Sequence, residues 1–338
     1  MNAIALKELP KNFLFPFTLT RSLLDIRIGI LTLREKWEIL LGQPIVIDQN
    51  NAALQTNIIP SKELIQSIRN GQTVFSDTQK IEFPWQLFQL TDMAIRNDFD
   101  LLTTMKMSEK LSVTNRVISP ENIFIEKGAR IEHAILNAST GPIYISKNAE
   151  IMEGSMIRGP FFLGEESIVK MGAKIYGATS IGKKCVIGGE VKNSVFFDYS
   201  NKAHDGYIGD SVIGAWCNLG AGTSNSNIKN TAGDVKVWHQ SSNTFINAGM
   251  KCGLLMGDYS RSSINTSFNT GTIVGICSNV FGSGLTPKFV KNFSWGFDDS
   301  KKYEFEKAVQ DISNWKKLKN ELINDIEIQN LKHIFENS

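Results

Sequence analysis

The sequence has little net charge, few cysteines and no long apolar run, and each shortage excludes a class of protein. Its 338 residues carry 36 Lys and Arg against 34 Asp and Glu, so no general positive charge attracts nucleic acid or an anionic membrane. No window approaches the roughly 18 consecutive apolar residues of a membrane helix, and the N-terminus lacks the basic and apolar segments of a signal peptide. We therefore expect a soluble, cytoplasmic protein without a nucleic-acid or membrane partner.

Cysteine and histidine are too scattered for a conventional metal site. The four cysteines form no C-x-x-C pair, which argues against a zinc knuckle and a disulfide framework, and we expect buried reduced thiols at Cys185, Cys217, Cys252 and Cys277. A carbonic-anhydrase-type zinc ion needs three imidazoles, and no metal-ligand spacing connects His133, His239 and His333. The sequence therefore predicts no metal ligands in the main site.

The sequence is rich, by contrast, in a six-residue repeat. Apolar residues stand six apart without exception at Ile145, Ile151, Ile157, Leu163, Val169, Ile175, Ile181 and Ile187. Four places after each comes a second series, mostly small or β-branched: Ala149, Ser155, Phe161, Ser167, Ala173, Thr179, Cys185 and Val191. Six is a multiple of two and not of 3.6, so an extended chain keeps these side chains on one face, whereas a helix scatters them. Because glycines cluster between the anchors, where the chain must turn, the repeat predicts a parallel β-helix filled by stacked aliphatic residues.

The β-helix is expected to occupy residues 116–286. The pattern begins loosely at Ile125 and Ile131, and it resumes after a break with Ile213 and Leu219. A later series falls on multiples of six at Met250, Met256, Phe268, Val274 and Val280. Between these parts, residues 224–244 are rich in Asn, Ser and Gly, which predicts a loop that projects from the prism.

Both ends of the chain have helical periodicity instead. Residues 33–41 place apolar side chains on one helical face before Gly42, residues 44–48 follow as a strand, and residues 60–71 and 84–98 predict two further helices. We therefore expect residues 1–115 to form a small α/β domain. Residues 287–338 predict a C-terminal helical tail, with helical spacing at Phe305, Ala308, Val309, Ile312 and Trp315.

The repeat breaks at NKAHDGYIGD, residues 201–210, which contains His204. Around the break, glutamate-x-lysine is followed after eleven residues by histidine-x-x-tyrosine-x-glycine-aspartate, and residues 218–223 then read asparagine-x-glycine-alanine-glycine-threonine. In this order and spacing the segment resembles the acetyltransferase half of the bacterial bifunctional enzymes that acetylate glucosamine-1-phosphate and then attach uridylate to make UDP-N-acetylglucosamine. The resemblance implies a mainly β fold with a left-handed β-helix, a homotrimer, and active sites between neighbouring subunits.

The resemblance also implies roles for individual residues. His204 would be the general base, and Glu190 would orient it. The residues that would contact the sugar phosphate are Lys192, Tyr207, Asn218 and Asn227. The backbone that would face the pantetheine arm of acetyl-coenzyme A is that of Gly220, Ala221 and Gly222. These roles suit the chemistry, because a neutral imidazole accepts a proton from an amine near pH 7 and a lysine offers a cation to a phosphate.

Two positions of the β-helix depart from that family. Its arginine about sixteen residues before the glutamate is replaced here by Lys174, which is a point charge without the bidentate fork of arginine. A tyrosine usually follows the second asparagine, and Ile228 stands there in this sequence. Phosphate binding by this site therefore depends on Lys174 in place of an arginine.

The N-terminal region departs further. The first 115 residues lack the glycine-rich G-x-G-T-R loop of the nucleotidyltransferase half and are about half as long as it, so Mg²⁺ is expected only if this region is active. Residues 16–38, PFTLTRSLLDIRIGILTLREKWE, resemble the start of uncharacterised bacterial sugar-nucleotidyltransferase-like proteins that join a reduced N-terminal domain to this β-helix. Arg21, Arg27 and Arg34 are candidates there for phosphate binding or for surface ion pairing.

Three hypotheses follow from these residues. The first is an acyl-coenzyme A-dependent N-acyltransferase that acts on an amino-sugar phosphate or nucleotide sugar, with His204 as base and acetyl-coenzyme A as donor. The second is a sugar-1-phosphate nucleotidyltransferase that uses the N-terminal region. The third is a non-catalytic sensor or scaffold that binds a sugar nucleotide without turnover.

Overall fold

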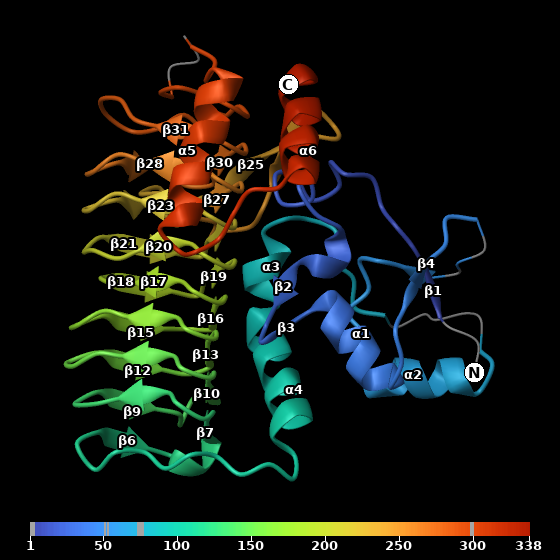
Figure 1. Cartoon of the computed structure of the whole chain (residues 1–338), viewed down its shortest axis with the longest axis vertical. Helices are drawn as coiled ribbons and strands as arrows, with labels where there is room; N and C mark the ends of the chain where they lie inside the picture. Colours follow the sequence, from blue (N-terminus) through green and yellow to red (C-terminus); the bar gives the residue numbers. More distant parts are fainter. Residues whose placement is uncertain (1–3, 51, 53, 73–77, 298–300) are drawn as a thin grey trace.

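A tall β-prism forms the body of the molecule, and the two ends of the chain pack against its sides (Figure 1). The computed structural model describes residues 4–50, 52, 54–72, 78–297 and 301–338. Three parallel sheets of nine, eight and six strands make the sides of the prism, and we call them the nine-, eight- and six-stranded faces. The chain visits the faces in turn, so the predicted parallel β-helix is confirmed.

Each face is a ladder of short strands. The nine-stranded face consists of β7 (Ile123–Ile125), β10 (Ile143–Ile145), β13 (Phe161–Leu163), β16 (Thr179–Ile181), β19 (Val195–Phe196), β22 (Val212–Ile213), β27 (Leu255–Met256), β30 (Ile273–Val274) and β32 (Phe289–Val290). The eight-stranded face consists of β8 (Arg130–Ile131), β11 (Glu150–Ile151), β14 (Ile168–Val169), β17 (Val186–Ile187), β20 (Asn201–Lys202), β23 (Asn218–Leu219), β28 (Arg261–Ser262) and β31 (Asn279–Val280). The six-stranded face consists of β6 (Arg116–Ile118), β9 (Ile135–Asn137), β12 (Met156–Arg158), β15 (Lys174–Tyr176), β18 (Glu190–Lys192) and β21 (Tyr207–Gly209), and β24 (Ser224–Asn225) and β29 (Ser267–Phe268) pair with each other in a separate two-stranded sheet.

The six-residue anchors fill the inside of the prism as the repeat predicts. Ile145 is paired in register with Leu163, and Leu163 with Ile181, so one coil takes eighteen residues, or three repeats. Every member of both predicted series is at most 2% exposed. Stacking these side chains removes their whole apolar surface from water, at roughly 25 cal/mol per Å² of area buried.

The coils shorten where the repeat breaks. Ile187 is paired with Lys202, only fifteen residues later, and Phe196 with Ile213, seventeen residues later. The register therefore puts a lysine in the inward position that Ile187 and Val169 occupy in the coils before it. Lys202 is 1% exposed, so the break in the repeat also places an ammonium group inside the prism.

The N-terminal region is α/β, as predicted. β1 (Ala5–Lys7) pairs in parallel with β4 (Val46–Ile47) and β5 (Leu54–Gln55), and β2 (Arg27–Ile28) pairs with β3 (Leu31–Thr32). Helix α1 (Leu33–Leu41) begins with a capping box between Thr32 and Glu35 and ends at Gly42 in the left-handed conformation. Helix α2 (Lys62–Arg69) is capped by Ser61, while the helix predicted at 84–98 is divided at Leu90 into α3 (Gln86–Gln89) and α4 (Thr91–Thr103).

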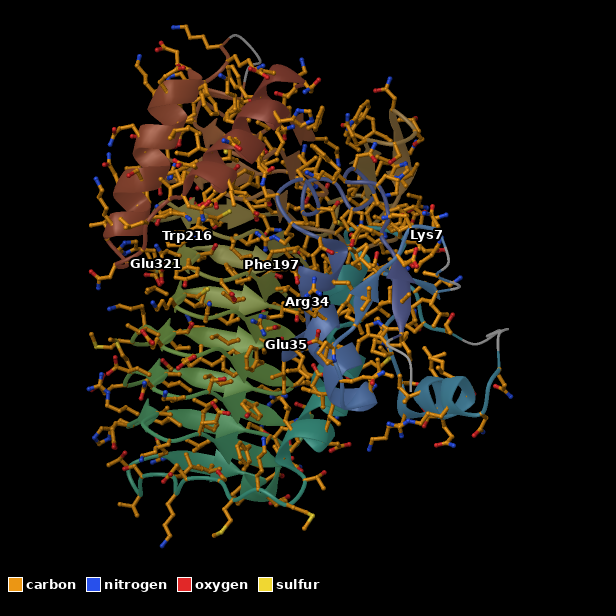
Figure 2. The ribbon with its side chains drawn as sticks, turned by 45° about the vertical axis from the view of Figure 1, so that its right-hand side comes forward. Lys7, Arg34, Glu35, Phe197, Trp216 and Glu321 are labelled. Atoms are coloured by element: carbon orange, nitrogen blue, oxygen red, sulfur yellow. The ribbon has the colours of Figure 1, made fainter. Side chains whose placement is uncertain are left out.

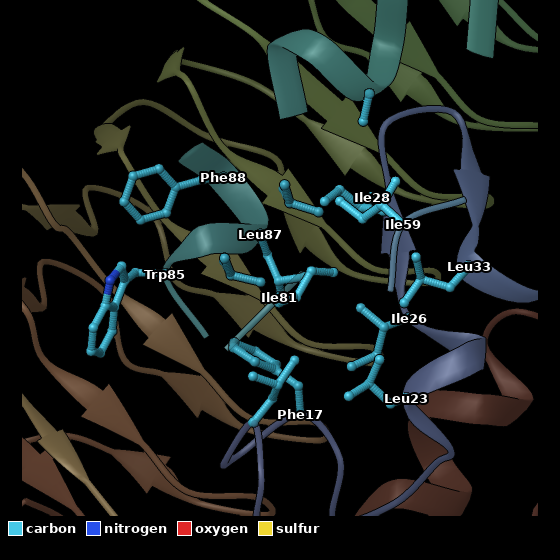
Figure 3. Close-up of a cluster of buried hydrophobic side chains, with 14 of the residues drawn as sticks. Phe17, Leu23, Ile26, Ile28, Leu33, Ile59, Ile81, Trp85, Leu87 and Phe88 are labelled. Atoms are coloured by element: carbon cyan, nitrogen blue, oxygen red, sulfur yellow. The ribbon is translucent and has the colours of Figure 1, made fainter. Parts of the chain in front are cut away.

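This region covers the nine-stranded face, because α3 and α4 lie between the prism and the remaining N-terminal elements (Figure 1). One buried cluster joins Phe17, Leu24 and Trp37 of the N-terminal region to Val212 and Leu255 of the prism, and its N-terminal part is drawn in Figure 3. The joint is also polar. Arg21 forms an ion pair with Asp258, and Arg27 lies 3.4 Å from Asp198. Apolar packing and these ion pairs therefore both attach the N-terminal region to the prism.

Two expectations about the region after the break were wrong. Residues 224–244 were expected to be a loop, but part of this segment forms a hairpin of β25 (Lys236–His239) and β26 (Thr244–Asn247), which packs on the N-terminal region through Val235, Val237 and Ala248. Met250 was expected to be an inward anchor, but it is 55% exposed because it belongs to the return from this hairpin and precedes the next strand. The other four predicted anchors of that series are buried.

The C-terminal tail is helical, as predicted, and it consists of two helices. Helix α5 (Phe305–Lys317) and helix α6 (Asp325–Glu336) are separated at Leu318–Asn324, and they pack on the corner between the nine- and eight-stranded faces through Ile312, Leu331 and Ile334. Figure 2 shows Glu321 of the tail near Trp216 of the prism. The prism also continues beyond residue 286, since β32 pairs with β30. None of the helices in the described ranges is long and apolar enough to cross a membrane.

Candidate active site

His204 lies on an exposed turn, residues 203–206, where the chain passes from the eight-stranded to the six-stranded face. The turn is held by the coils on both sides. Glu190 N–H donates to the Gly206 carbonyl at 3.1 Å, and Gly222 N–H donates to the Asp205 carbonyl at 2.9 Å. A side chain at Gly206, where φ is +123°, would meet the Thr223 carbonyl oxygen at 2.1 Å. The imidazole is thus carried by a backbone that stacks tightly against its neighbours.

The predicted donor-binding turn, residues 220–222, lies directly on the His204 turn. Close packing leaves no room for a side chain at its two glycines. A Cβ at Gly220 would lie 2.5 Å from the Ser263 backbone, and one at Gly222 would lie 2.1 Å from Asn265 Oδ1. The Ala221 carbonyl accepts from Asn265 N–H at 2.7 Å, while its own N–H donates to no acceptor in the described part of the chain. This turn therefore offers one free backbone donor close to His204.

Lys202 supports the same turn from inside the prism. Its Nζ donates to the Gly188 carbonyl at 3.2 Å and to the His204 carbonyl. Burial lowers the pKa of Lys202 to about 8, and the nearby Asp205 carboxylate offsets part of this effect. Burying an ammonium group is costly unless it is hydrogen-bonded, and here two backbone carbonyls of the corner accept from it. Lys202 was not predicted, although the fifteen-residue spacing from Ile187 was the available signal.

Four of the predicted residues share the outer surface of the six-stranded face. Lys174, Glu190 and Tyr207 follow one another in register in one column, and Lys192 stands beside them in the next column. Among the described residues no hydrogen bond joins Glu190 to His204. Glu190 Oε1 instead accepts from Tyr176 OH at 2.6 Å, and this bond is the main cause that raises the pKa of Tyr176 to about 12.

Asn227 reaches the same face but is held by a carboxylate. Asp210 accepts from Asn193 Nδ2 at 2.6 Å and, through its other oxygen, from Asn227 Nδ2. The pKa of Tyr207 is raised, mainly by burial and then by the Asp210 charge. Asp210 thus connects Asn193 in the coil below it with Asn227 in the coil above it.

Asn218 lies around the corner from these residues. It is on the eight-stranded face, in register between Asn201 and Arg261. The tail covers its neighbours, since Lys319 Nζ donates to Asn201 Oδ1 at 2.9 Å and the Arg261 guanidinium lies 5.6 Å from the Trp315 ring centroid. One chain therefore brings His204 and residues 220–222 together and places Glu190, Lys192, Tyr207 and Lys174 beside them, but it puts Asn218 on another face.

The candidates in the N-terminal region are engaged in ion pairs. Arg21 pairs with Asp258, Arg27 lies 3.4 Å from Asp198, and Arg34 Nε lies 2.7 Å from Asp25 Oδ1. Of their two predicted roles, ion pairing is the one that the structure supports. In the described ranges no three His, Cys, Asp or Glu side chains gather in a way that could hold a metal ion.

Comparisons with known proteins find similarity over parts of the chain. Residues 8–79 match the family model described as sugar nucleotidyl transferase. The chain is 38% identical over 111 residues to a bifunctional GlmU protein of Thermodesulfovibrio yellowstonii, covering 32% of this chain and 22% of that protein. It is 29% identical over 186 residues to a bifunctional GlmU protein of Methanococcus maripaludis, covering 53% of this chain and 44% of that protein.

A solved structure of the polySia specific acetyltransferase NeuO covers 57% of this chain and 87% of its own, with 13% identity and a TM-score of 0.30, which is too low to support an argument. The matched segments span less than half the length of the two GlmU proteins. The chain is thus similar to parts of the bifunctional GlmU proteins, and the sugar nucleotidyl transferase model matches its residues 8–79.

Proposed function

We propose that this chain is an acyl-coenzyme A-dependent N-acyltransferase that acts on an amino-sugar phosphate or nucleotide sugar, with His204 as general base. One observation carries the proposal. The exposed imidazole stands on a turn fixed by both neighbouring coils, between a turn with a free backbone N–H and a face that carries Lys192 and Lys174. Similarity to the bifunctional GlmU proteins supports a sugar-directed transferase. So does a 29% identity over 143 residues to a bifunctional sugar-1-phosphate nucleotidylyltransferase/acetyltransferase of Sulfurisphaera tokodaii.

The chemistry needs a base at this position. An ammonium group has no lone pair, so the sugar amine must lose a proton before its nitrogen attacks the thioester carbonyl of acetyl-coenzyme A. His204 would take that proton and release it to water. As the new N–C bond forms and the C–S bond breaks, His204 would take the second proton that the amide nitrogen does not keep and pass it to the departing thiolate. A positioned base contributes about 10²- to 10⁴-fold in rate.

The remaining residues divide between the two substrates. Lys192 and Lys174 supply positive charge for the phosphate, and Tyr207 and Asn227 supply polar contacts to the sugar. The Ala221 N–H is the donor that the turn offers to the acyl or pantetheine carbonyl of acetyl-coenzyme A. Glu190 is bound to Tyr176 in the free chain, so we propose that it acts on His204 only once substrate has rearranged this pair. A homotrimer would bring Asn218 of one subunit toward the six-stranded face of another.

The test replaces His204 by asparagine, which is polar but is not a base at neutral pH. Release of coenzyme A from acetyl-coenzyme A is measured with glucosamine-1-phosphate as acceptor, and kcat is expected to fall about 10²-fold or more with KM for the donor little changed. His133→Asn is the matched control, because His133 is an exposed histidine at the same corner of the prism, four coils away. Unchanged turnover in His204→Asn, or no binding of coenzyme A to the wild type by calorimetry, would overturn the proposal.

The family match at residues 8–79 favours one alternative, a sugar-1-phosphate nucleotidyltransferase. The three arginines of that region are ion-paired, which leaves little positive charge there for a nucleoside triphosphate. Pyrophosphate release from a nucleoside triphosphate and a sugar-1-phosphate in the presence of Mg²⁺ would establish that activity. Tight binding of a sugar nucleotide without turnover in either assay would instead identify a sensor or scaffold.

A further inference from the structure

An open groove runs down the outer surface of the six-stranded face, away from the His204 corner. Its outward-facing lining consists of Ile135, Asn137, Met156, Arg158, Lys174 and Tyr176. The groove holds about 440 Å³, which is within the range of about 300–1,000 Å³ that small-molecule pockets occupy. In the proposed reaction Lys174 faces the phosphate and Tyr176 holds Glu190, whereas the other residues of the groove have no role.

The strand register orders this lining by distance from His204. Tyr207 belongs to the coil of His204, and Lys192 lies one coil below it. Tyr176 and Lys174 lie one coil further, and Arg158 and Met156 one coil beyond those. Neighbouring strands are about 4.8 Å apart, so Arg158 lies about 10 Å below Lys192 along the face. The cations therefore form a line and not a single cluster.

The three cations of this line are available to an anion. In the described part of the chain, Arg158, Lys174 and Lys192 take part in no ion pair. Lys192 Nζ only lies over the Tyr176 ring, at 5.8 Å from its centroid. Two carboxylates lie near them: Glu190 is bound to Tyr176 OH, and Asp210 is held by Asn193 and Asn227. Three positive charges against two carboxylates leave a net positive charge along this line.

The lower part of the groove is apolar and exposed. Met156 and Ile135 are each 42% exposed and are consecutive in one column, and Asn137 stands beside them with an amide that can donate and accept. Apolar side chains at this exposure favour a flat apolar ligand group, such as a base, over water. The surface thus changes from cationic to apolar with increasing distance from His204.

From this order we infer that the acceptor is a nucleotide-linked amino sugar, whose diphosphate lies along Lys192, Lys174 and Arg158 and whose base rests on Met156 and Ile135. The inference rests on the proposed function, because it sets the sugar amine at His204. A sugar monophosphate would reach only the upper cations, whereas a sugar, two phosphates, a ribose and a base in series would occupy the whole line. Arg158 would also supply the bidentate fork that Lys174 lacks.

The test compares two ligands in the full-length protein. Calorimetry measures the affinity of UDP-N-acetylglucosamine and of N-acetylglucosamine-1-phosphate, and coenzyme A release is followed with UDP-glucosamine and with glucosamine-1-phosphate as acceptors. We expect the nucleotide-linked ligand to bind at least about tenfold more tightly. Arg158→Ala should weaken it about tenfold, which is the loss of one charged hydrogen-bonded contact, and should change the monophosphate affinity less than twofold. Arg130→Ala, which removes an exposed arginine from the neighbouring face, should change neither affinity.

The outcomes separate this inference from the proposed function. Equal affinity for the two ligands, or an equal effect of Arg158→Ala on both, overturns the inference even if glucosamine-1-phosphate is acetylated. Binding of the nucleotide-linked ligand that depends on Arg158, without acetyl transfer to either acceptor, supports the binding site and overturns the proposed function. Preferential acetylation of UDP-glucosamine that is lost in Arg158→Ala supports both.

Discussion

Lys202 offers a direct test of how the prism tolerates an ammonium group in its interior. The side chain is 1% exposed and takes an inward position that is aliphatic in the coils before it. Its pKa is lowered from 10.5 to about 8, chiefly by burial, so the charged form is disfavoured in the folded protein. The proposed perturbation is Lys202→Met, which keeps an unbranched side chain of similar length and removes the charge.

The lowered pKa fixes both the sign and the size of the effect. Below pH 8 the lysine is protonated in the folded and the unfolded protein, and the folded state bears the full cost of the buried charge, about 3 kcal/mol. Between pH 8 and 10.5 the folded lysine is neutral while the unfolded lysine still binds a proton, so the free energy of unfolding rises with pH. Lys202 should therefore add about 2–3 kcal/mol of stability between pH 7 and pH 10.

The assay is urea unfolding followed by circular dichroism at pH 7 and pH 10, at one protein concentration. Other groups titrate over this range, so the quantity of interest is the difference between the wild-type and variant changes. Lys202→Met should lack the gain of about 2–3 kcal/mol, whereas Lys147→Met, at a lysine whose side chain is 59% exposed, should keep it. The same pH dependence in the wild type and Lys202→Met would refute the reasoning, since it would mean that water reaches the ammonium group.

Two other groups of residues give predictions. All six tyrosines have raised pKa values, mainly through burial and, for Tyr176, through its bond to Glu190. The absorbance of the native protein at 295 nm should therefore stay flat through pH 10, whereas the tyrosines of the urea-unfolded protein should ionise there. A native tyrosine that ionises near pH 10 would contradict this prediction. Asp258→Ala should cost about 3–5 kcal/mol of unfolding free energy, because it leaves the Arg21 guanidinium without its carboxylate at the joint between the N-terminal region and the prism. Asp25→Ala, which breaks the more exposed pair with Arg34, should cost at most about 1 kcal/mol of unfolding free energy in the same denaturation experiment. Equal losses of unfolding free energy in the two variants would contradict a structural role for the Arg21–Asp258 pair.

The prism could be predicted because the repeat that specifies it lies within short stretches of sequence. A repeat of six residues brings Ile145, Leu163 and Ile181 into one ladder whatever the rest of the chain does, since three repeats complete one coil. The failure at Met250 has the same origin. Six-residue spacing is meaningful only within an unbroken stack, and the inserted hairpin separates Met250 from the coils that follow. The tail could not be placed from the sequence, because its contacts with Tyr199 and Lys184 span more than 120 residues.

The arrangement of the site could be predicted only in part, because it depends on which strands pair and in which register. His204 and residues 220–222 were expected at one place, and they lie together because both form the same turn in consecutive coils. Asn218 and Glu190 both precede an inward anchor, which hides the fact that they belong to different faces. The bond from Tyr176 to Glu190 depends on a coil shortened to sixteen residues, and the hexapeptide rule does not anticipate it. Sequence motifs therefore nominate candidate residues, but they do not show which of them face one another.

The coverage of the prism limits where a second subunit can approach. The N-terminal region covers the nine-stranded face, and the tail covers the upper part of the eight-stranded face. The six-stranded face and the lower part of the eight-stranded face remain, and they meet along the corner that carries His133 and, four coils above it, His204. If the chain assembles as the proposed trimer, its subunits must then meet along this corner, beside Glu190 and Lys192. Assembly and the acceptor site would then share one surface.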